Sequence, residues 1–379
     1  MSGYDCIVIG TGGLGSAALE QLARRGARVL GLDRFPPGHA RGSSHGSTRM
    51  IRRAYFEHPS YVPLVERAYG AWKALSDRCG RRLLVTCGLV QVGPGDGPVL
   101  SGVRASARQH GLAIEELTAV EVERRMPGLR VPVSSRGIVE PGAGYLHVEA
   151  CITTQARLAV EQGAEIRIGP AVKSWRAGPR DVTVVTDAGE LRADRLIITA
   201  GAWSADLLGE LGIRLRVLRK PLYWFAARSD AYDAEQGFPA FLYETPTGIF
   251  YGFPRIDPDG VKVGRHSGGR EIKDPLALNL DIDRDDFETV KQFVTNCLPR
   301  ATGQLRRHAA CMYTMTNDQH FIVDRHPATP RVAFAAGMSG HGFKFAPVIG
   351  EALADLALTG RTELPLDFLA CRRAALHGG

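Results

Sequence analysis

The 379-residue sequence contains no run of 18 or more apolar residues and no C-x-x-C pair. The first absence predicts that no helix crosses a membrane. Histidines and cysteines also do not cluster at zinc-ligand spacing, so a metal site and a disulfide framework are both disfavoured, and we expect no metal. Most of the seven scattered cysteines are predicted to be small buried hydrophobic residues.

Recognisable targeting signals are absent from both ends of the sequence. Residues 1–5 lead straight into a predicted strand, without the basic region and apolar segment of a secretion signal. The last residues carry no peroxisomal tripeptide. The chain also has no internal repeat, low-complexity tract or long linker. We therefore expect a soluble cytoplasmic protein.

The composition is that of a globular protein, with 44% hydrophobic and 23% charged residues. A length of 379 residues predicts about two domains. The 44 glycines indicate many tight turns and close backbone approaches, as cofactor-binding α/β proteins require.

Positive charge is concentrated between Arg24 and Arg53, where eight arginines accompany a single acid, Asp33. A nucleic-acid surface would also be basic. This stretch, however, lacks interleaved aromatic residues and adjoins a phosphate-binding motif. It therefore predicts an anionic cofactor and an anionic substrate, and no nucleic-acid partner.

Residues 4–34 contain the most informative motif of the sequence. An apolar strand, the sequence GTGGLG, an amphipathic helix and a second apolar strand follow one another. Gly10, Gly12 and Gly15 allow a tight turn, close approach to a pyrophosphate and close packing of helix on strand. The helix N-terminus favours the phosphate charge, and Asp33 is placed to bind a ribose hydroxyl. A dinucleotide site follows, although the pattern alone leaves NAD and FAD open.

The remaining pattern alternates strands and helices. Helices are predicted at 60–77, 99–110, 147–163, 281–298 and 346–360, and strands at 82–94, 131–147, 164–169, 181–187, 193–201, 331–338 and repeatedly over 215–268. The fold class is therefore α/β, with a Rossmann-like cofactor domain into which a mostly antiparallel α+β domain is inserted. We expect the cofactor domain to comprise 1–80, 145–215 and 308–379, and the substrate domain to comprise 81–144 and 216–307.

Residues 308–323 predict a strand, a polar turn and a second strand, with Cys311 on the first. No second cysteine lies nearby. Taken alone, this thiol is read as an ordinary buried residue.

The order of several motifs resembles that of the monomeric sarcosine oxidases and N-methyltryptophan oxidases, a group that includes pipecolate oxidases. The motifs are GSSHGSTRMIRRAY, FYGFP, CMYTMTNDQHFIVD and GMSGHGFKFAPVIGEALADLAL, and the resemblance extends from about residue 4 to 365. It implies a glutathione-reductase-type FAD fold and a flavin joined covalently to Cys311 through a thioether. A tether of this kind needs one thiolate on a rigid strand.

The resemblance also implies roles for individual residues. Further FAD contacts would come from Ser43, Ser44, Thr48, Val172, Gly340, Gly342, Phe343 and Lys344. His45 and Arg49 would lie against the flavin, and Lys262 would activate dioxygen, although a lysine on a strand is ordinarily solvent-facing. Arg52 and Lys344 would bind the substrate carboxylate; Arg49 and Arg52 would share a face if this stretch were helical. The remaining lining of the substrate pocket would be Tyr251, Tyr313, His266 and Leu242.

Several of these positions keep a second interpretation. Tyr251 and Tyr313 also fit ordinary sheet aromatics, and His341 fits a structural as well as a catalytic histidine. Arg53 is predicted to be a solvated or phosphate-contacting residue.

Four departures from the pattern of these oxidases concern the substrate side. Ser47 stands where an acid is usual, and RIDPDG replaces a glycine-rich turn before Lys262. Arg265 replaces an aromatic residue before His266, and Leu242 stands where the sarcosine enzymes tend to have methionine.

The expected function is oxidation of sarcosine or another N-methyl-L-amino acid by a monomeric enzyme, giving an imine that hydrolyses to amine and aldehyde, while O2 becomes hydrogen peroxide. Three alternatives remain. The substrate would instead be a cyclic imino acid such as pipecolate, proline or piperideine carboxylate, or the enzyme would be a flavin dehydrogenase with another electron acceptor. A non-catalytic flavin-binding subunit would not need Arg52, Lys262, Cys311 and Lys344 together.

Overall fold

The computed structural model describes residues 3–376 and contains two large sheets and one small sheet. The predicted α/β class is confirmed. The first large sheet is parallel at its centre and at the β9 edge, and β10, β11 and β18 are joined to it by antiparallel pairing. Six of its strands lie in the order β10 (Val172–Ala177), β11 (Val182–Thr186), β12 (Gly189–Ile198), β1 (Tyr4–Ile9), β2 (Val29–Asp33) and β9 (Glu165–Ile168). In addition, β19 (Val332–Ala336) pairs with β12, and β18 (Ile322–Arg325) pairs with β19.

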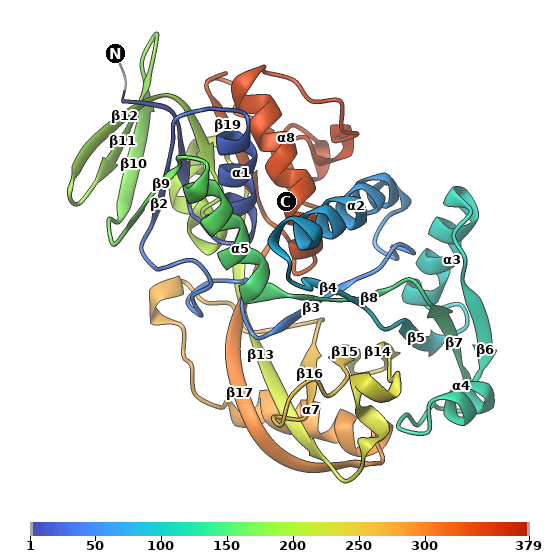
Figure 1. Cartoon of the computed structure of the whole chain (residues 1–379). Coiled ribbons are helices and arrows are strands. Elements are labelled where there is room, and N and C mark those ends of the chain that lie inside the picture. The colour runs from blue at the N-terminus through green and yellow to red at the C-terminus, as the bar shows by residue number, and fades with distance from the viewer. Residues whose placement is uncertain (1–2, 377–379) are drawn as a thin grey trace.

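Four helices pack together beside this sheet (Figure 1). Helix α1 (Gly13–Arg24) contacts both α5 (Val148–Glu161) and α8 (Ala346–Leu358), and α2 (Val62–Cys79) contacts α8. Their apolar faces and the strands form the largest core cluster, which includes Leu19, Leu22, Ile349 and Leu353. The helix over the glycine motif is therefore fixed by packing on both of its flanks.

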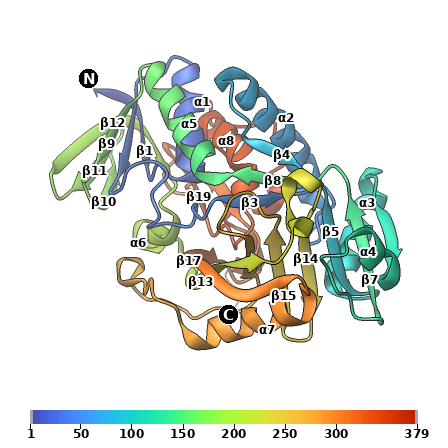
Figure 2. The same cartoon turned by 60° about the horizontal axis from the view of Figure 1, so that its bottom comes forward.

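The second large sheet is antiparallel except for one parallel pair, β5 with β14. Its order is β17 (Ala301–Met315), β13 (Arg216–Ala227), β16 (Val261–Arg265), β15 (Gly248–Phe253), β14 (Ala240–Thr245), β5 (Leu89–Pro94), β7 (Ser135–Glu140) and β6 (Glu115–Thr118). Helix α7 (Arg284–Cys297) covers one face and contacts β16 and β17 (Figure 2). Buried aromatic residues such as Phe241, Phe250 and Phe293 fill this second core.

The small sheet consists of β3 (Thr48–Ile51), β8 (Gly144–His147) and β4 (Leu84–Thr86). Around the second sheet lie α3 (Pro98–His110) and α4 (Ala119–Arg125), and the short α6 (Ser204–Leu207) contacts β10. Because Thr48–Ile51 pairs with β8, Arg49 lies on a strand and Arg52 directly follows it. The condition under which Arg49 and Arg52 would share a helix face is therefore not met.

Three of the four predicted domain boundaries fall at or within strands, and the fourth, at 80/81, follows the end of α2. The division at 307/308 lies inside β17, the one at 144/145 lies inside β8, and β13 begins at Arg216. The predicted strands at 82–94 and 131–147 each separate into two shorter strands, which belong to different sheets. The division into two domains stays a prediction. No helix among residues 3–376 is long and apolar enough to cross a membrane.

Candidate active site

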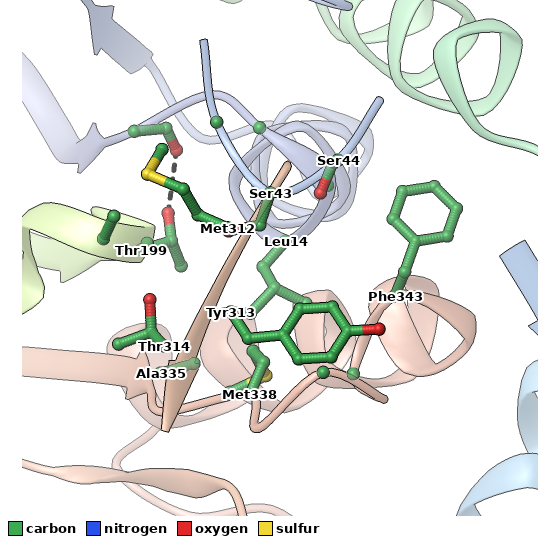
Figure 3. Close-up of a pocket in the computed structure, with 18 of the residues that line it drawn as sticks. Leu14, Ser43, Ser44, Thr199, Met312, Tyr313, Thr314, Ala335, Met338 and Phe343 are labelled. Atoms are coloured by element: carbon green, nitrogen blue, oxygen red, sulfur yellow. Dashed lines mark hydrogen bonds between the residues drawn. The ribbon is translucent and has the colours of Figure 1, made fainter. Parts of the chain in front are cut away.

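One elongated cavity extends from the glycine motif of the first sheet to the inner face of the second. Figure 3 shows part of it, and Ser43, Ser44, Tyr313 and Phe343 are among the labelled lining residues. Most of the predicted site residues line it, namely Gly10, Gly12, Asp33, Ser43, Ser44, Arg49, Arg52, Val172, Leu242, Tyr251, His266, Tyr313, Gly340, Gly342, Phe343 and Lys344. Five others do not contribute to the lining: Gly15, His45, Thr48, Lys262 and Cys311.

The glycine motif closes one end of the cavity with bare backbone. Gly10 has a φ of +86°, and a Cβ atom there would lie 2.5 Å from the Thr199 carbonyl oxygen. A Cβ atom at Gly15 would lie 1.7 Å from the Gly10 carbonyl oxygen, so α1 can approach β1 only with glycine at this position. The carboxylate of Asp33 accepts hydrogen bonds from the backbone N–H of Thr11 (2.7 Å) and of Phe35 (3.0 Å). It is thereby held at the cavity wall with acceptor capacity to spare.

Cys311 lies on β17, where its thiol meets the side chain of Arg49. Arg49 Nη2 is 3.3 Å from Cys311 Sγ and donates to the Ser43 carbonyl oxygen (2.7 Å). The thiol itself donates to Ser43 O (3.1 Å). Burial raises the pKa of the thiol, but the charge of Arg49 and the neighbouring His45 outweigh burial and lower the pKa to about 7. A substantial fraction of this thiol is therefore thiolate near neutral pH.

Lys262 is 2% exposed, unlike the solvent-facing lysine expected on a strand. Its ammonium donates to Gly46 O (2.6 Å), Thr48 O (2.8 Å) and Thr48 Oγ1 (3.1 Å). Its Nζ also lies 4.8 Å from the centre of the Phe253 ring. Burial and the charge of Arg49 lower its pKa well below the usual value. Through its hydrogen bonds to Gly46 and Thr48, the ammonium holds the turn that leads into β3.

The same turn is held from the other side by Glu149, which the sequence analysis missed. Its Oε1 accepts from the N–H groups of Gly46 (2.7 Å) and Ser47 (3.1 Å). Ser47, where the resemblance predicts an acid, has a left-handed φ of 70°. Arg307 Nη1 reaches Ser47 Oγ (3.4 Å) and Asp259 Oδ2 (2.9 Å). The serine and the RIDPDG turn, two departures from the expected pattern, therefore meet at one arginine.

Arg52 is 3% exposed and lies over two aromatic rings. The guanidinium carbon is 4.2 Å from the centre of Tyr55 and 4.5 Å from that of Phe56. Nη2 donates to both carboxylate oxygens of Glu57 (2.8 and 2.7 Å), whereas buried Nη1 has no hydrogen-bond partner among the described residues. The Nη2 group of the guanidinium is therefore paired, whereas Nη1 lacks an acceptor.

Lys344 is a second buried cation at this end of the cavity. Its Nζ donates to His341 O (2.8 Å) and to the Tyr55 hydroxyl (3.2 Å). Burial and the charge of Arg52 lower its pKa to about 7. Burial would raise the pKa of Glu57, but the charges of Arg52, His341 and Lys344 lower it to about 2. The group thus contains two cations and one carboxylate, an excess of positive charge.

His341 has hydrogen-bond partners on both ring nitrogens. Nδ1 pairs with the Tyr55 hydroxyl (2.7 Å) and Nε2 lies 3.0 Å from Gln319 O. Burial lowers its pKa to about 3, so the ring is neutral near pH 7. This geometry favours the structural interpretation of His341, although the side chain also lines the cavity.

The remaining walls of the pocket are aromatic and apolar. His266 and Tyr313 have ring centres 5.7 Å apart, and burial lowers the pKa of His266 to about 4. Leu242 and Tyr251 pack in one cluster with Phe56, which the sequence analysis did not single out. Arg265 does not line the cavity; it donates to Thr247 O (2.6 Å). The side-chain space beside the cations is therefore mainly apolar.

Comparison with known proteins gives consistent results over nearly the whole chain. Residues 5–356 match the family described as FAD dependent oxidoreductase. The chain is 38% identical to a monomeric sarcosine oxidase of Bacillus sp. (strain B-0618), covering 98% of this chain and 97% of the relative. It is 40% identical to an N-methyl-L-tryptophan oxidase of Salmonella heidelberg (strain SL476), covering 95% of each chain.

The structure is also similar to solved structures of oxidases. NikD, described as an unusual amino acid oxidase essential for nikkomycin biosynthesis, superposes with a TM-score of 0.87 at 26% identity, and all of both chains is covered. Glycine oxidase from Geobacillus kaustophilus shares the fold, with a TM-score of 0.81 at 20% identity over 98% of each chain.

The residues present fit FAD. The bare glycine backbone at Gly10 and Gly12 accommodates a pyrophosphate, Asp33 has acceptors for a ribose, and the cavity continues to the Arg49 and Tyr313 side chains. Among residues 3–376, no group of three or more histidine, cysteine or acidic side chains is arranged to hold a metal ion. From the fold, the cavity and the near-complete match, the chain belongs to the FAD-dependent oxidoreductase family that includes the monomeric sarcosine oxidases and the N-methyl-L-tryptophan oxidases.

Proposed function

We propose that this enzyme oxidises sarcosine or another N-methyl-L-amino acid at its C–N bond and uses O2 as the electron acceptor. The observation that carries the proposal is the pair of buried cations, Arg52 and Lys344, that line the cavity. When bound, FAD accepts a hydride equivalent from the substrate and delivers the two electrons to O2, which gives hydrogen peroxide.

In this proposal Arg52 and Lys344 bind the substrate carboxylate. Nη1 of Arg52 has no hydrogen-bond partner among the described residues, and a substrate carboxylate oxygen would supply one while Nη2 remains paired with Glu57. Lys344 contributes a second, compact cation. Anchoring the carboxylate leaves the secondary amine between Tyr251, His266 and Tyr313, and this fixed orientation is the chain's main contribution to the rate.

The side chain of the substrate would face the apolar cluster of Leu242, Phe56 and Tyr251. Glu57 is the carboxylate beside the two cations, and it is already paired with Arg52. No protein base is needed if the substrate amine binds in its neutral form. Water then hydrolyses the imine product, and an oxidised N-methyl group is released as formaldehyde.

The flavin is proposed to be attached covalently to Cys311. Arg49, 3.3 Å from the sulfur, favours the thiolate that forms such a bond. The ammonium of Lys262, buried behind the β3 turn, is proposed to offset the negative charge that develops when O2 is reduced. Both proposals, together with the monomeric state and the two-domain division, extend what the relatives suggest.

A panel of substrates tests the function directly. Purified enzyme is mixed with sarcosine, N-methyl-L-alanine, N-methyl-L-tryptophan, L-pipecolate and L-proline, and peroxide and formaldehyde are measured together. Peroxide with equal formaldehyde supports N-methyl oxidation. Peroxide without formaldehyde on the cyclic substrates would instead indicate a cyclic imino acid oxidase. Slow reoxidation of the reduced flavin in air would indicate a dehydrogenase. Failure of all five compounds to reduce the flavin would contradict the proposal.

Mass spectrometry of the acid-denatured protein tests the covalent attachment. The account predicts one added FAD on the wild-type chain and none on Cys311→Ala. Cys151→Ala is the matched control, because that thiol is also buried but lies on α5 in the helical core. An unmodified wild-type chain in a yellow preparation would show that FAD is bound non-covalently.

A further inference from the structure

Lys220 is a buried cation to which the proposed chemistry assigns no task. It lies on β13, directly opposite Cys311 of β17 in the sheet register, and it is 2% exposed. Burial of an ammonium is unfavourable unless its hydrogen-bond donors find acceptors. The way in which these donors are satisfied therefore indicates what the side chain does.

All three donors of the ammonium point at one turn of the chain. Nζ donates to the carbonyl oxygens of His266 (2.7 Å), Ser267 (3.1 Å) and Gly268 (2.9 Å). Three consecutive carbonyl groups thus converge on one side chain, which has three N–H groups to offer. We refer to residues 266–268 as the His266 turn.

The backbone of this segment is shaped to wrap around Lys220. Gly268 and Gly269 both have left-handed φ values, +63° and +121°. A Cβ atom at Gly269 would lie 2.9 Å from Arg219 O and 3.2 Å from Lys220 Cδ. The turn is therefore in close contact with the stem of the lysine as well as with its charge.

The same ammonium reaches a second wall of the substrate pocket. Its Nζ lies 4.9 Å from the centre of the Tyr313 ring, a cation–π distance. The Tyr313 ring is in turn 5.7 Å from the His266 ring, and both side chains line the cavity, whereas Lys220 does not. Lys220 therefore contacts the backbone of His266 and the ring of Tyr313 from outside the cavity.

We propose that Lys220 is a positioning residue of the substrate site, which fixes the His266 turn and the Tyr313 ring so that both side chains hold the geometry the substrate requires. The part of this inference that concerns substrate rests on the proposed function; the part that concerns the turn does not. Supporting residues of this kind decide whether a site is held within the tolerance of the reaction.

Electrostatics gives the positioning a second, measurable consequence. Burial lowers the pKa of His266, and Lys220, Arg52 and Lys344 lower it further, against the opposing charge of Glu57. Removing the Lys220 charge therefore raises the pKa of His266, although burial keeps it below an ordinary histidine. The lysine has a lowered pKa of its own, about 7, caused by burial and the charge of Arg265.

The test uses the holoenzyme with Lys220→Met and Lys220→Gln. Methionine keeps most of the length but removes the charge and every donor, whereas glutamine restores part of the hydrogen bonding without charge. Lys273→Met is the matched control, since Lys273 is exposed and lies in the same segment, a few residues beyond the turn. Hydrogen exchange of residues 264–270, the His266 titration by NMR and the kinetics with sarcosine are measured for each.

For Lys220→Met we expect faster exchange in the turn, a raised His266 pKa and a loss in kcat/KM of about 10- to 100-fold, since small misplacements of reacting groups cost that much. Lys220→Gln should recover part of the exchange protection and of kcat/KM, and Lys273→Met should match wild type. If Lys220→Met lowers only thermal stability and leaves exchange in the turn, the His266 titration and kcat/KM unchanged, the inference is overturned.

The exchange and titration readouts separate this inference from the proposed function. If wild-type enzyme oxidises no N-methyl amino acid but Lys220→Met still loosens the turn and shifts the His266 titration, the positioning role stands and the substrate assignment fails. If sarcosine is oxidised and neither readout moves, the substrate assignment stands and the role of Lys220 fails.

Discussion

Replacement of Arg52 by alanine separates a stabilising role of this residue from a substrate-binding role. The guanidinium and the Glu57 carboxylate are 4% and 13% exposed and 2.7 Å apart. Removing one partner of a buried ion pair leaves the other charge uncompensated and costs about 3–5 kcal/mol of folding free energy. We therefore expect Arg52→Ala to unfold at a clearly lower denaturant concentration.

The same substitution removes the proposed clamp for the substrate carboxylate. Hydrogen bonds to charged groups contribute about 1.5–3 kcal/mol, which corresponds to a decrease in kcat/KM of about 10- to 140-fold. Arg53→Ala is the control, because Arg53 pairs with Glu66 (2.9 Å) and covers the Tyr69 ring outside the cavity. It should keep kcat/KM within about twofold of wild type.

A double substitution resolves the two effects of Arg52. Arg52→Met with Glu57→Leu removes both charges, so that no buried charge is left unpaired and much of the stability returns. The carboxylate clamp remains absent, and kcat/KM should remain low. Steady-state kinetics and urea unfolding measure both quantities. Wild-type kcat/KM in Arg52→Ala, or full recovery of kcat/KM in the double variant, would refute the clamp.

Three further predictions concern the other buried groups. Lys262→Met should slow flavin reoxidation by O2 about 10²- to 10³-fold while substrate reduces the flavin at nearly the wild-type rate; stopped-flow traces that show equal reoxidation would remove Lys262 from the oxidative step. Since the pKa of Lys344 is lowered to about 7, its charge is present below that pH and lost above it; inhibition by acetate should weaken as pH rises through 7, and Lys344→Met should flatten this part of the profile. Gly15→Ala, whose Cβ would lie 1.7 Å from Gly10 O, should abolish FAD binding, whereas Gly70→Ala in α2, with nothing within 4 Å, should leave FAD content unchanged; normal FAD content in Gly15→Ala would contradict the packing argument.

Local sequence patterns predicted the parts of the fold that depend on local interactions. The strand, glycine turn and helix of residues 4–24 follow from periodicity and from the backbone freedom of glycine, and the structure has them as β1 and α1. Five long helices were also predicted close to their observed ranges. The short strand at Thr48–Ile51 was not foreseen, because its conformation is imposed by pairing with Gly144–His147, nearly a hundred residues away.

The candidate site shows the same limit. Glycines and cationic residues in motifs are visible in the sequence, but the environment of each charge is not. The burial of Lys262 depends on carbonyl groups more than 200 residues away, and Lys220 reaches its acceptors across 46 to 48 residues. Glu57 lies close to Arg52 in sequence, and an acid five residues after a candidate clamp arginine was a signal that could have been used.

The most direct test of the central claim is anaerobic mixing of the purified enzyme with sarcosine and N-methyl-L-alanine, followed by admission of air. We expect the flavin absorbance to be bleached in proportion to substrate, formaldehyde to appear in equal amount, and air to restore the oxidised spectrum with release of hydrogen peroxide. A flavin that stays oxidised with both N-methyl amino acids would contradict the account.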